Sequence, residues 1–220
     1  RAAGLPCVMV DDASSLECAR ELDRLAMADT EVSLVRLPVN LGKGGAVMAG
    51  LRAAHERGFT HALQIDADGQ HAMSDITRFV AESRAHPEVL VCGRPVFDQA
   101  MPRGRFYGRY LTHVFVWLNT LSFDIPDSMC GFRMYPLAPV LQLVESSRLG
   151  SRMDFDVEVL VRLHWRGQPM RWLDTRVSYP LDGVSHFRMV WDNVLMVRLQ
   201  VRLLAGMLLR LPLLLWRKIR

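Results

Sequence analysis

The chain has 220 residues, a formal net charge of +4 and an apolar fraction of 50%. This length and composition argue against disorder and predict one domain over 1–190, followed by a helical segment over 191–220. We find no basic patch interleaved with aromatic residues and no helix-turn-helix or zinc-finger pattern, so nucleic acid is not an expected partner.

The four cysteines show no metal-ligand spacing. Cys7 and Cys92 fall in apolar runs, where a thiol behaves as a small hydrophobic group. Free, buried thiols are typical of a reducing compartment, which favours the cytoplasmic side of a membrane. No uncharged apolar run approaches the length of a membrane-spanning helix.

The first predicted strand, 5–10, ends in two carboxylates, Asp11 and Asp12. A pair of serines then suits the N-cap of a helix over 16–28. The carboxylates either cap this helix and compensate its dipole or bind the base and ribose of a nucleotide. A second strand with the same kind of ending, described below, favours the nucleotide.

A third region combines a strand over 32–37, a glycine-rich turn and a helix over 46–57. A glycine-rich turn at the start of a helix presents backbone N–H groups to an anion, and Lys43 adds a positive charge. Gly42 and Lys43 are therefore candidates for binding a donor phosphate. The alternative is a tight turn between strand and helix with no ligand.

The most informative stretch is a buried strand, 61–65, that runs directly into Asp66-Ala67-Asp68-Gly69-Gln70. In extended backbone Asp66, Asp68 and Gln70 point to the same side. Such oxygen atoms hold Mg²⁺ or Mn²⁺ while leaving positions for phosphate oxygens. Because open α/β sheets bind ligands at the carboxyl ends of their strands, we interpret the stretch as a metal and diphosphate site. The alternative is a polar turn that precedes a helix over 74–85.

A strand over 89–92 then leads to Arg94, which either reaches a phosphate or is a surface charge. The alternation of strands and helices up to this point predicts an α/β fold with a mostly parallel sheet and helices on both faces. An irregular segment over 96–104 precedes a helix over 106–123 that is rich in aromatic residues.

The stretch around residues 127–133 places a carboxylate, a hydroxyl and a guanidinium beside a Gly-Phe-Arg turn that opens a short strand. Asp127 and Ser128 can line an acceptor site, and the planar fork of Arg133 suits phosphate oxygens. The alternative is an N-capped turn without a ligand.

Two later segments add further candidates. A helix that ends at Trp165 carries Asp156 and Glu158 in its first turn, where acidic residues also serve simply to compensate the helix dipole. A late strand over 169–179 leads to a loop with His186, which is either a metal ligand, a phosphate contact or a plain loop residue.

The C-terminal segment predicts a long helix over 191–209 that Pro212 breaks or kinks. On a helical wheel its arginines gather on about a third of the circumference: Arg198, Arg202, Arg210, Arg217 and Arg220. This pattern is typical of an amphipathic helix that lies in a bilayer interface with its arginines on anionic head groups. It indicates a peripheral position on the inner face of a membrane; the alternative is packing against another subunit or domain.

Taken in order, these motifs resemble the family 2 glycosyltransferases of GT-A fold, and within them the dolichol-phosphate mannosyltransferase-like branch. The matching elements are Val10-Asp11-Asp12-Ala13-Ser14-Ser15, Asn40-Leu41-Gly42-Lys43-Gly44-Gly45, Asp66-Ala67-Asp68-Gly69-Gln70, Cys130-Gly131-Phe132-Arg133, Phe155-Asp156-Val157-Glu158 and Gly183-Val184-Ser185. The resemblance implies a Rossmann-like GT-A domain and a metal-dependent, inverting glycosyltransferase with Mg²⁺ or Mn²⁺. Its donor would be a UDP- or GDP-linked sugar, and its acceptor would be lipid-linked or otherwise close to a membrane.

The resemblance also implies roles for individual residues. The donor-binding set is Asp11, Asp12, Gly42, Lys43, Asp66, Arg94 and Arg133, and the metal set is Asp66, Asp68 and Gln70. Ser128 and Gly131 would face the acceptor. An anionic lipid phosphate needs no general base, whereas a hydroxyl acceptor needs a carboxylate, for which Asp127 is the first choice and Glu158 the second.

The chain departs from the family pattern in two places. The family opens with an apolar strand whose turn touches the nucleotide base, and nothing like it precedes Arg1, so we expect the first strand to be missing. His186 stands where polyprenyl-phosphate enzymes often carry a lysine. Two other functions fit part of the pattern: a sugar-phosphate nucleotidyltransferase, and a membrane-docking module of the same fold without activity.

Overall fold

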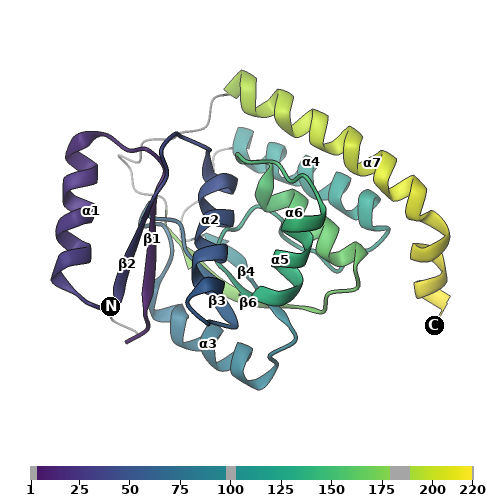
Figure 1. Cartoon of the computed structure of the whole chain (residues 1–220). Helices are drawn as coiled ribbons and strands as arrows, with labels where there is room; N and C mark the ends of the chain where they lie inside the picture. Colours follow the sequence, from purple (N-terminus) through teal and green to yellow (C-terminus); the bar gives the residue numbers. More distant parts are fainter. Residues whose placement is uncertain (1–3, 98–102, 179–188, 220) are drawn as a thin grey trace.

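The computed structural model describes residues 4–97, 103–178 and 189–219, and these form strands flanked by helices (Figure 1). The strands are β1 (Cys7–Asp11), β2 (Val32–Arg36), β3 (His61–Gln64), β4 (Leu90–Phe97), β5 (Arg133–Pro136) and β6 (Met170–Val177). The helices are α1 (Leu16–Ala28), α2 (Lys43–Glu56), the 3-10 turn η1 (Met73–Asp75), α3 (Ile76–Ala85), α4 (Arg103–Thr120), α5 (Leu137–Ser146), α6 (Phe155–Trp165) and α7 (Met189–Ile219). The loop that contains His186 lies outside the described residues.

The larger of the two sheets has the strand order β3-β5-β4-β6, and β1 pairs with β2 in a separate parallel pair. β4 and β6 are parallel, whereas β5 lies antiparallel between β3 and β4. The predicted α/β fold with mostly parallel strands is therefore confirmed, with β5 as the exception. The sequence does not reveal this direction, because the two-residue period of a strand reads the same both ways.

Two hydrophobic cores lie on opposite faces of this sheet. In β4, Leu90 and Cys92 belong to the larger core and Val91 to the smaller one, because successive side chains of a strand point to opposite faces. Residues of α2, α5 and α6 complete the larger core. Phe79 of α3 completes the smaller one, so helices cover both faces as predicted.

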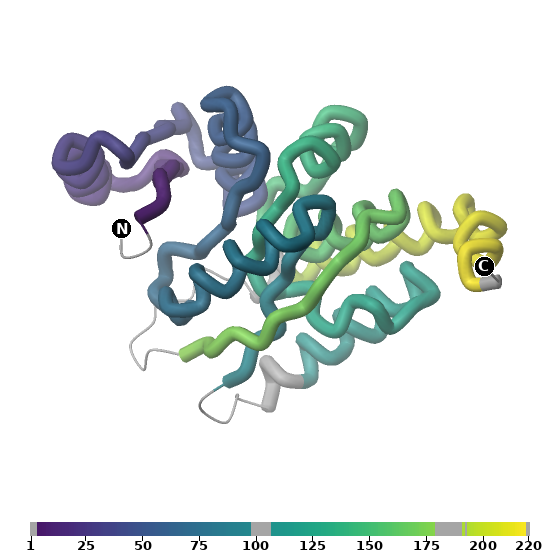
Figure 2. The backbone as a smooth tube through the Cα atoms, turned by 90° about the horizontal axis from the view of Figure 1, so that it is seen from below, coloured from purple at the N-terminus to yellow at the C-terminus, as the bar shows by residue number. Residues whose placement is uncertain are grey.

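The β1–β2 pair and α1 lie at one end of the molecule, and α7 lies at the other (Figure 2). The N-cap predicted for α1 is confirmed, because the Ser15 hydroxyl accepts a hydrogen bond from the backbone N–H of Cys18. No residue of α1 is buried. Cys7 is exposed, so the expectation that it lies buried in a strand is wrong; β1 belongs to a two-stranded sheet outside both cores.

α7 is one continuous helix of 31 residues that includes Pro212. Figure 1 shows it running along the outside of the molecule beside α4 and bending toward its C-terminal end, and because the helix continues past Pro212, the proline does not break it. The side of α7 that joins the larger core carries Leu199, Leu203, Met207 and Leu214.

Three arginines of α7 contact the protein, namely Arg202, Arg210 and Arg217, which corrects the expectation that these three reach head groups, whereas Arg198 is exposed. Arg202 binds the carboxylate of Glu158, and Arg217 donates to the carbonyl of Trp165 at 2.9 Å. The guanidinium of Arg210 lies 4.8 Å above the Trp165 ring. A helical wheel shows which residues share a face but not which face meets the core, because that depends on the neighbouring helices.

The opposite side of α7 is apolar and exposed, and so is one side of α4, which packs beside it. We call these residues the outer apolar face: Leu111, Val114 and Leu118 of α4 with Val194, Val197, Val201, Leu204 and Leu208 of α7. The spacing of three or four residues places each set in one stripe along its helix. None of the described helices has the length and hydropathy to cross a bilayer.

Candidate functional site

The site begins at the turn before α2, which Asp12 holds in place. Its carboxylate accepts hydrogen bonds from the backbone N–H groups of Leu41 (2.6 Å) and Gly42 (2.8 Å). Gly42 has a φ of +84°, a conformation that favours glycine. The turn therefore delivers Lys43 as the first residue of α2 in a fixed position. In this arrangement Asp12 joins β1 to the turn, and its contact with a nucleoside stays a prediction.

Lys43 is the centre of the site. Its Nζ lies 2.6 Å from Oδ2 of Asp66, just after β3, and 2.7 Å from Oδ2 of Asp156, in the first turn of α6. Burial lowers the pKa of Lys43, but the Asp156 and Asp66 carboxylates outweigh burial and raise it above its usual value. The ammonium therefore stays charged and joins two segments that are far apart in the sequence.

Asp156 is the inner carboxylate of this group, with a side chain that is 5% exposed. Burial raises its pKa, but Lys43 and Arg133 outweigh this and hold the pKa below its usual range. Gln64, at the end of β3, donates a long hydrogen bond of 3.4 Å to the same carboxylate. The sequence pattern also allowed a role in dipole compensation, but the side chain points at Lys43 and serves as its partner.

Arg133 does not face a phosphate site, contrary to expectation. Its side chain is 1% exposed and donates to the carbonyls of Asp156 (2.8 Å) and Ser128 (2.9 Å) and to the Tyr135 hydroxyl (3.2 Å). Buried among these groups, its guanidinium stabilises the loop before β5 and the negative charge of Asp156. The Ser128 side chain is itself fully buried, so it does not line an open acceptor site in this structure.

The expected metal ligands lie in the turn after β3. Asp66 is 23% exposed at its side chain, and Asp68 is exposed and accepts a hydrogen bond from the backbone N–H of Gln70 at 3.0 Å. Within the described residues, no group of three or more His, Cys, Asp or Glu side chains could hold a metal ion. The two carboxylates and the amide oxygen of Gln70 are nevertheless donors that suit Mg²⁺ or Mn²⁺.

Gly131 lies directly against Asp66. A Cβ atom at this position would stand 2.6 Å from Oδ2 of Asp66, closer than a side chain tolerates. The glycine therefore makes room for the carboxylate, which is a different role from the acceptor contact that we expected. The ammonium of Lys43, 2.6 Å from Oδ2 of Asp66, shows that this carboxylate binds a cation in the folded chain, which supports the fit of a metal ion here.

Asp127 lies in a buried cluster with residues of α4. Its carboxylate accepts hydrogen bonds from Arg109 and from the backbone N–H groups of Met129 and Cys130, and His113 Nε2 lies 3.4 Å away. Burial raises its pKa, but His113 and Arg109 outweigh burial and lower it to about 2. A carboxylate with this pKa is a weak proton acceptor, which argues against the role of general base.

Two other expected site residues, Asp11 and Arg94, are paired with groups other than Lys43. Asp11 is 2% exposed, and its carboxylate accepts from Arg36 and from the backbone of Ser14. Arg94 forms an exposed pair with Asp174, with Nε and Oδ1 2.6 Å apart.

Glu158 is fully buried, and its carboxylate is not free to accept a proton from an acceptor hydroxyl. It accepts hydrogen bonds from Arg162 on its own helix, from Arg202 on α7 and from the backbone N–H of Gly150. Its surroundings are those of a structural anchor between α6 and α7.

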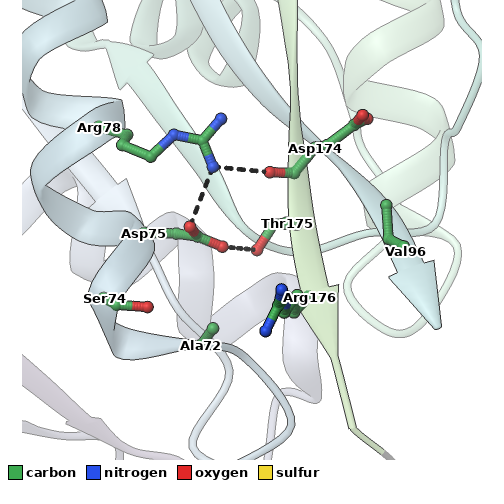
Figure 3. Close-up of a pocket in the computed structure, with 8 residues that line it drawn as sticks. All are labelled: Ala72, Ser74, Asp75, Arg78, Val96, Asp174, Thr175 and Arg176. Atoms are coloured by element: carbon green, nitrogen blue, oxygen red, sulfur yellow. Dashed lines mark hydrogen bonds and ion pairs between the residues drawn. The ribbon is translucent and has the colours of Figure 1, made fainter. Parts of the chain in front are cut away.

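A hollow of about 380 Å³ lies beside the segment that follows the expected metal turn (Figure 3). Arg78 of α3 reaches across it to Asp75 and to the carbonyl of Asp174, and Asp75 accepts from the Thr175 hydroxyl. Arg176 of β6 also lines it. No local sequence pattern marks these residues, because β6 and η1 meet only in the folded chain.

Comparison with known proteins completes the description of the site. A sequence model of glycosyl transferase family 2 matches residues 5–140. A dolichyl-phosphate beta-glucosyltransferase from Drosophila melanogaster is 31% identical over 190 residues, which cover 80% of this chain and 56% of that relative. An undecaprenyl-phosphate mannosyltransferase from Micrococcus luteus is 27% identical over 158 residues, which cover 67% of this chain and 63% of the relative. The chain thus spans less than two thirds of the length of these relatives.

A similar fold occurs in the crystal structure of glucosyl-3-phosphoglycerate synthase from Mycobacterium tuberculosis in complex with Mn²⁺ and uridine-diphosphate-glucose. The TM-score is 0.57 at 13% identity, over 93% of this chain and 79% of that one. At this identity the likeness concerns the fold alone.

Proposed function

Because the chain belongs to glycosyl transferase family 2, we propose that it moves a sugar from a nucleotide-sugar to an anionic, lipid-linked acceptor, with inversion at the sugar carbon. The observation that carries the proposal is the group formed by Lys43, Asp66 and Asp156 at the carboxyl end of β3. This is the edge where α/β sheets bind ligands, and an ammonium there can neutralise a diphosphate.

In this proposal Asp66, Asp68 and Gln70 hold Mg²⁺ or Mn²⁺. When bound, the cation stabilises the negative charge that grows on the departing nucleoside diphosphate. Lys43 supplies a second positive charge beside the same phosphates, and Gly42, with its φ of +84°, permits the turn that positions Lys43. The donor is a UDP- or GDP-linked sugar.

The surroundings of Asp127 favour an acceptor that is already ionised. Arg109, His113 and two backbone N–H groups occupy its carboxylate and keep it deprotonated. A hydroxyl acceptor would need a base that takes up a proton, whereas a lipid phosphate attacks without one. The names of the relatives, which act on dolichyl and undecaprenyl phosphates, support the same class of acceptor.

The outer apolar face brings the acceptor and the enzyme together at a membrane. Residues 103–120 and 189–219 carry eight basic side chains and one acidic one, so this part of the chain has a net positive charge. Exposed apolar side chains next to basic ones favour the interface of a bilayer with anionic lipids. Because Arg109 of α4 also binds Asp127, the same helix connects this surface to the loop before β5.

Thermal shift measurements test the donor and the metal. UDP-, GDP- and CDP-linked sugars are added with and without Mn²⁺, and stabilisation by one nucleotide only with metal is the expected result. Transfer of labelled sugar to a polyprenyl phosphate, but not to the corresponding polyprenol, is then expected. Release of pyrophosphate from a nucleoside triphosphate would instead indicate a nucleotidyltransferase. No binding of any donor, with membrane binding intact, would indicate a docking module without activity.

Vesicle sedimentation tests the membrane surface. Vesicles of phosphatidylcholine with and without phosphatidylglycerol are compared for the wild type, Val201→Asp and Met27→Asp. Both side chains are exposed, but Val201 belongs to the outer apolar face and Met27 lies on α1. We expect Val201→Asp to reduce binding to anionic vesicles roughly tenfold and Met27→Asp to leave it unchanged. Equal binding by both variants would contradict the assignment of this surface.

A further inference from the structure

Lysine is rare in this chain. Lys43 and Lys218 are its only lysines, although lysine and arginine together number 27. Arginine is a planar fork, whereas an ammonium is a compact point charge on a flexible stem. The chain therefore places a partly buried ammonium at a position where a small, movable cation fits between two carboxylates.

The two carboxylates that bind Lys43 differ in their surroundings. The side chain of Asp156 is 5% exposed and keeps Arg133 at 3.7 Å as a second positive neighbour. The side chain of Asp66 is 23% exposed, and Lys43 is its only ion-pair partner in the described parts of the chain. Without Lys43, the outer carboxylate would be open to another cation, while the inner one would remain paired.

We propose that Lys43 occupies the cation position beside Asp66 in the metal-free protein and leaves it when a divalent cation binds. This rests on the proposed function, in which Asp66 is a metal ligand. The ammonium and a divalent cation cannot both lie within 3 Å of one carboxylate oxygen without strong repulsion. Lys43 keeps its contact with Asp156 and turns its charge to the diphosphate of the donor.

This exchange makes the metal and the nucleotide bind cooperatively. The metal alone must displace the ammonium from Asp66, which weakens its binding. A nucleoside diphosphate offers oxygens to both cations, so the ammonium gains a new partner as it leaves the old one. Each ligand therefore strengthens the binding of the other by the same factor.

Titration of Mn²⁺ followed by electron paramagnetic resonance tests the exchange without any catalytic turnover. The wild type, Lys43→Met and the control Lys218→Met are compared with and without UDP or GDP. A residue that merely maintains the site would weaken Mn²⁺ binding when it is removed. We expect the opposite for Lys43→Met: Mn²⁺ alone binds about tenfold more tightly, and the nucleotide adds less to its affinity. Equal or weaker binding of Mn²⁺ by folded Lys43→Met would overturn the proposal.

Nuclear magnetic resonance of the wild type covers the case in which Lys43→Met does not fold. Protein labelled with ¹³C in its lysine side chains contains two such side chains, and Lys218 serves as the internal reference. Addition of Mg²⁺ with UDP or GDP is expected to shift the Lys43 signal and leave Lys218 in place. If metal and nucleotide bind but the Lys43 signal stays, the exchange is refuted and the proposed function stands. If neither binds, both fail.

Discussion

Replacement of Glu158 by glutamine tests whether its carboxylate has a structural or a catalytic role. Glu158 is fully buried and binds Arg162, Arg202 and the backbone of Gly150, so it joins α6, α7 and the preceding loop. Glutamine keeps the size of the side chain but removes its charge. It leaves both guanidinium groups without their anionic partner.

The expected loss in the free energy of unfolding depends on how exposed the side chains of Arg162 and Arg202 are. Removal of one partner from a fully buried ion pair costs about 3–5 kcal/mol. Here the side chains of Arg162 and Arg202 are 18% and 46% exposed, so water solvates part of the stranded charge. We therefore expect a loss of about 2–3 kcal/mol, which corresponds to a fall in Tm of roughly 4–12 °C for a chain of this size.

Thermal unfolding followed by circular dichroism measures this loss, and a sugar-transfer assay below the Tm measures activity. Arg202→Met provides the matched control, because it removes the same contact from the side of α7. Glu158→Gln should lower the Tm and retain most of the turnover, and the double variant should lose less than the sum of the two single ones. An unchanged Tm with a collapse of turnover would refute the structural role.

Three further changes probe the site. Gly131→Ala places a methyl group against the Asp66 carboxylate. It should weaken Mn²⁺ binding at least about tenfold and lower the free energy of unfolding by roughly 1 kcal/mol. A calorimetric loss of Mn²⁺ affinity no larger than the loss of folding stability would contradict this. Asp68→Ala should reduce transfer at saturating metal by about a hundredfold or more with an unchanged Tm, and near-normal turnover would exclude Asp68 as a ligand. The folded-state pKa of Asp127, about 2, lies below its ordinary value of 3.8, so its contribution to stability is complete above pH 4 and is lost as the pH falls toward 2. The free energy of unfolding of Asp127→Asn should therefore fall by about 2 kcal/mol less than that of the wild type when the pH is lowered. If urea unfolding gives the same pH dependence for both proteins, the assignment is refuted.

The local elements of the fold were readable from the sequence to a large extent. The helix predicted over 16–28 has those bounds in the structure, and the strand predicted over 32–37 ends one residue earlier. Both carry local signals, a serine cap in one case and an apolar stretch with two valines in the other. α5 was not predicted, because this short helix carries Pro139 in its first turn, where a proline is tolerated but resembles a break.

The amphipathic C-terminal helix shows what the sequence pattern does not predict, namely which face of a helix is buried. Its arginines form a face in the sequence, and we expected that face to meet a membrane. Arg202 and Arg217 instead bind groups of α6, and the apolar stripe that contains Val201 faces outward. Periodicity defines the faces of a helix, but the packing partner decides which of them is buried.

The sequence by itself determined where strands end in carboxylates and where glycines open a turn, because backbone period and turn chemistry act over a few residues. Only the tertiary structure decided which charges meet. Lys43, Asp66 and Asp156 come from three separate elements, and their ion pairs depend on how α2, β3 and α6 pack. Arg133 and Glu158 have the same residue types as site groups, yet burial commits them to holding the fold together, since a buried charge is stable only beside its partners.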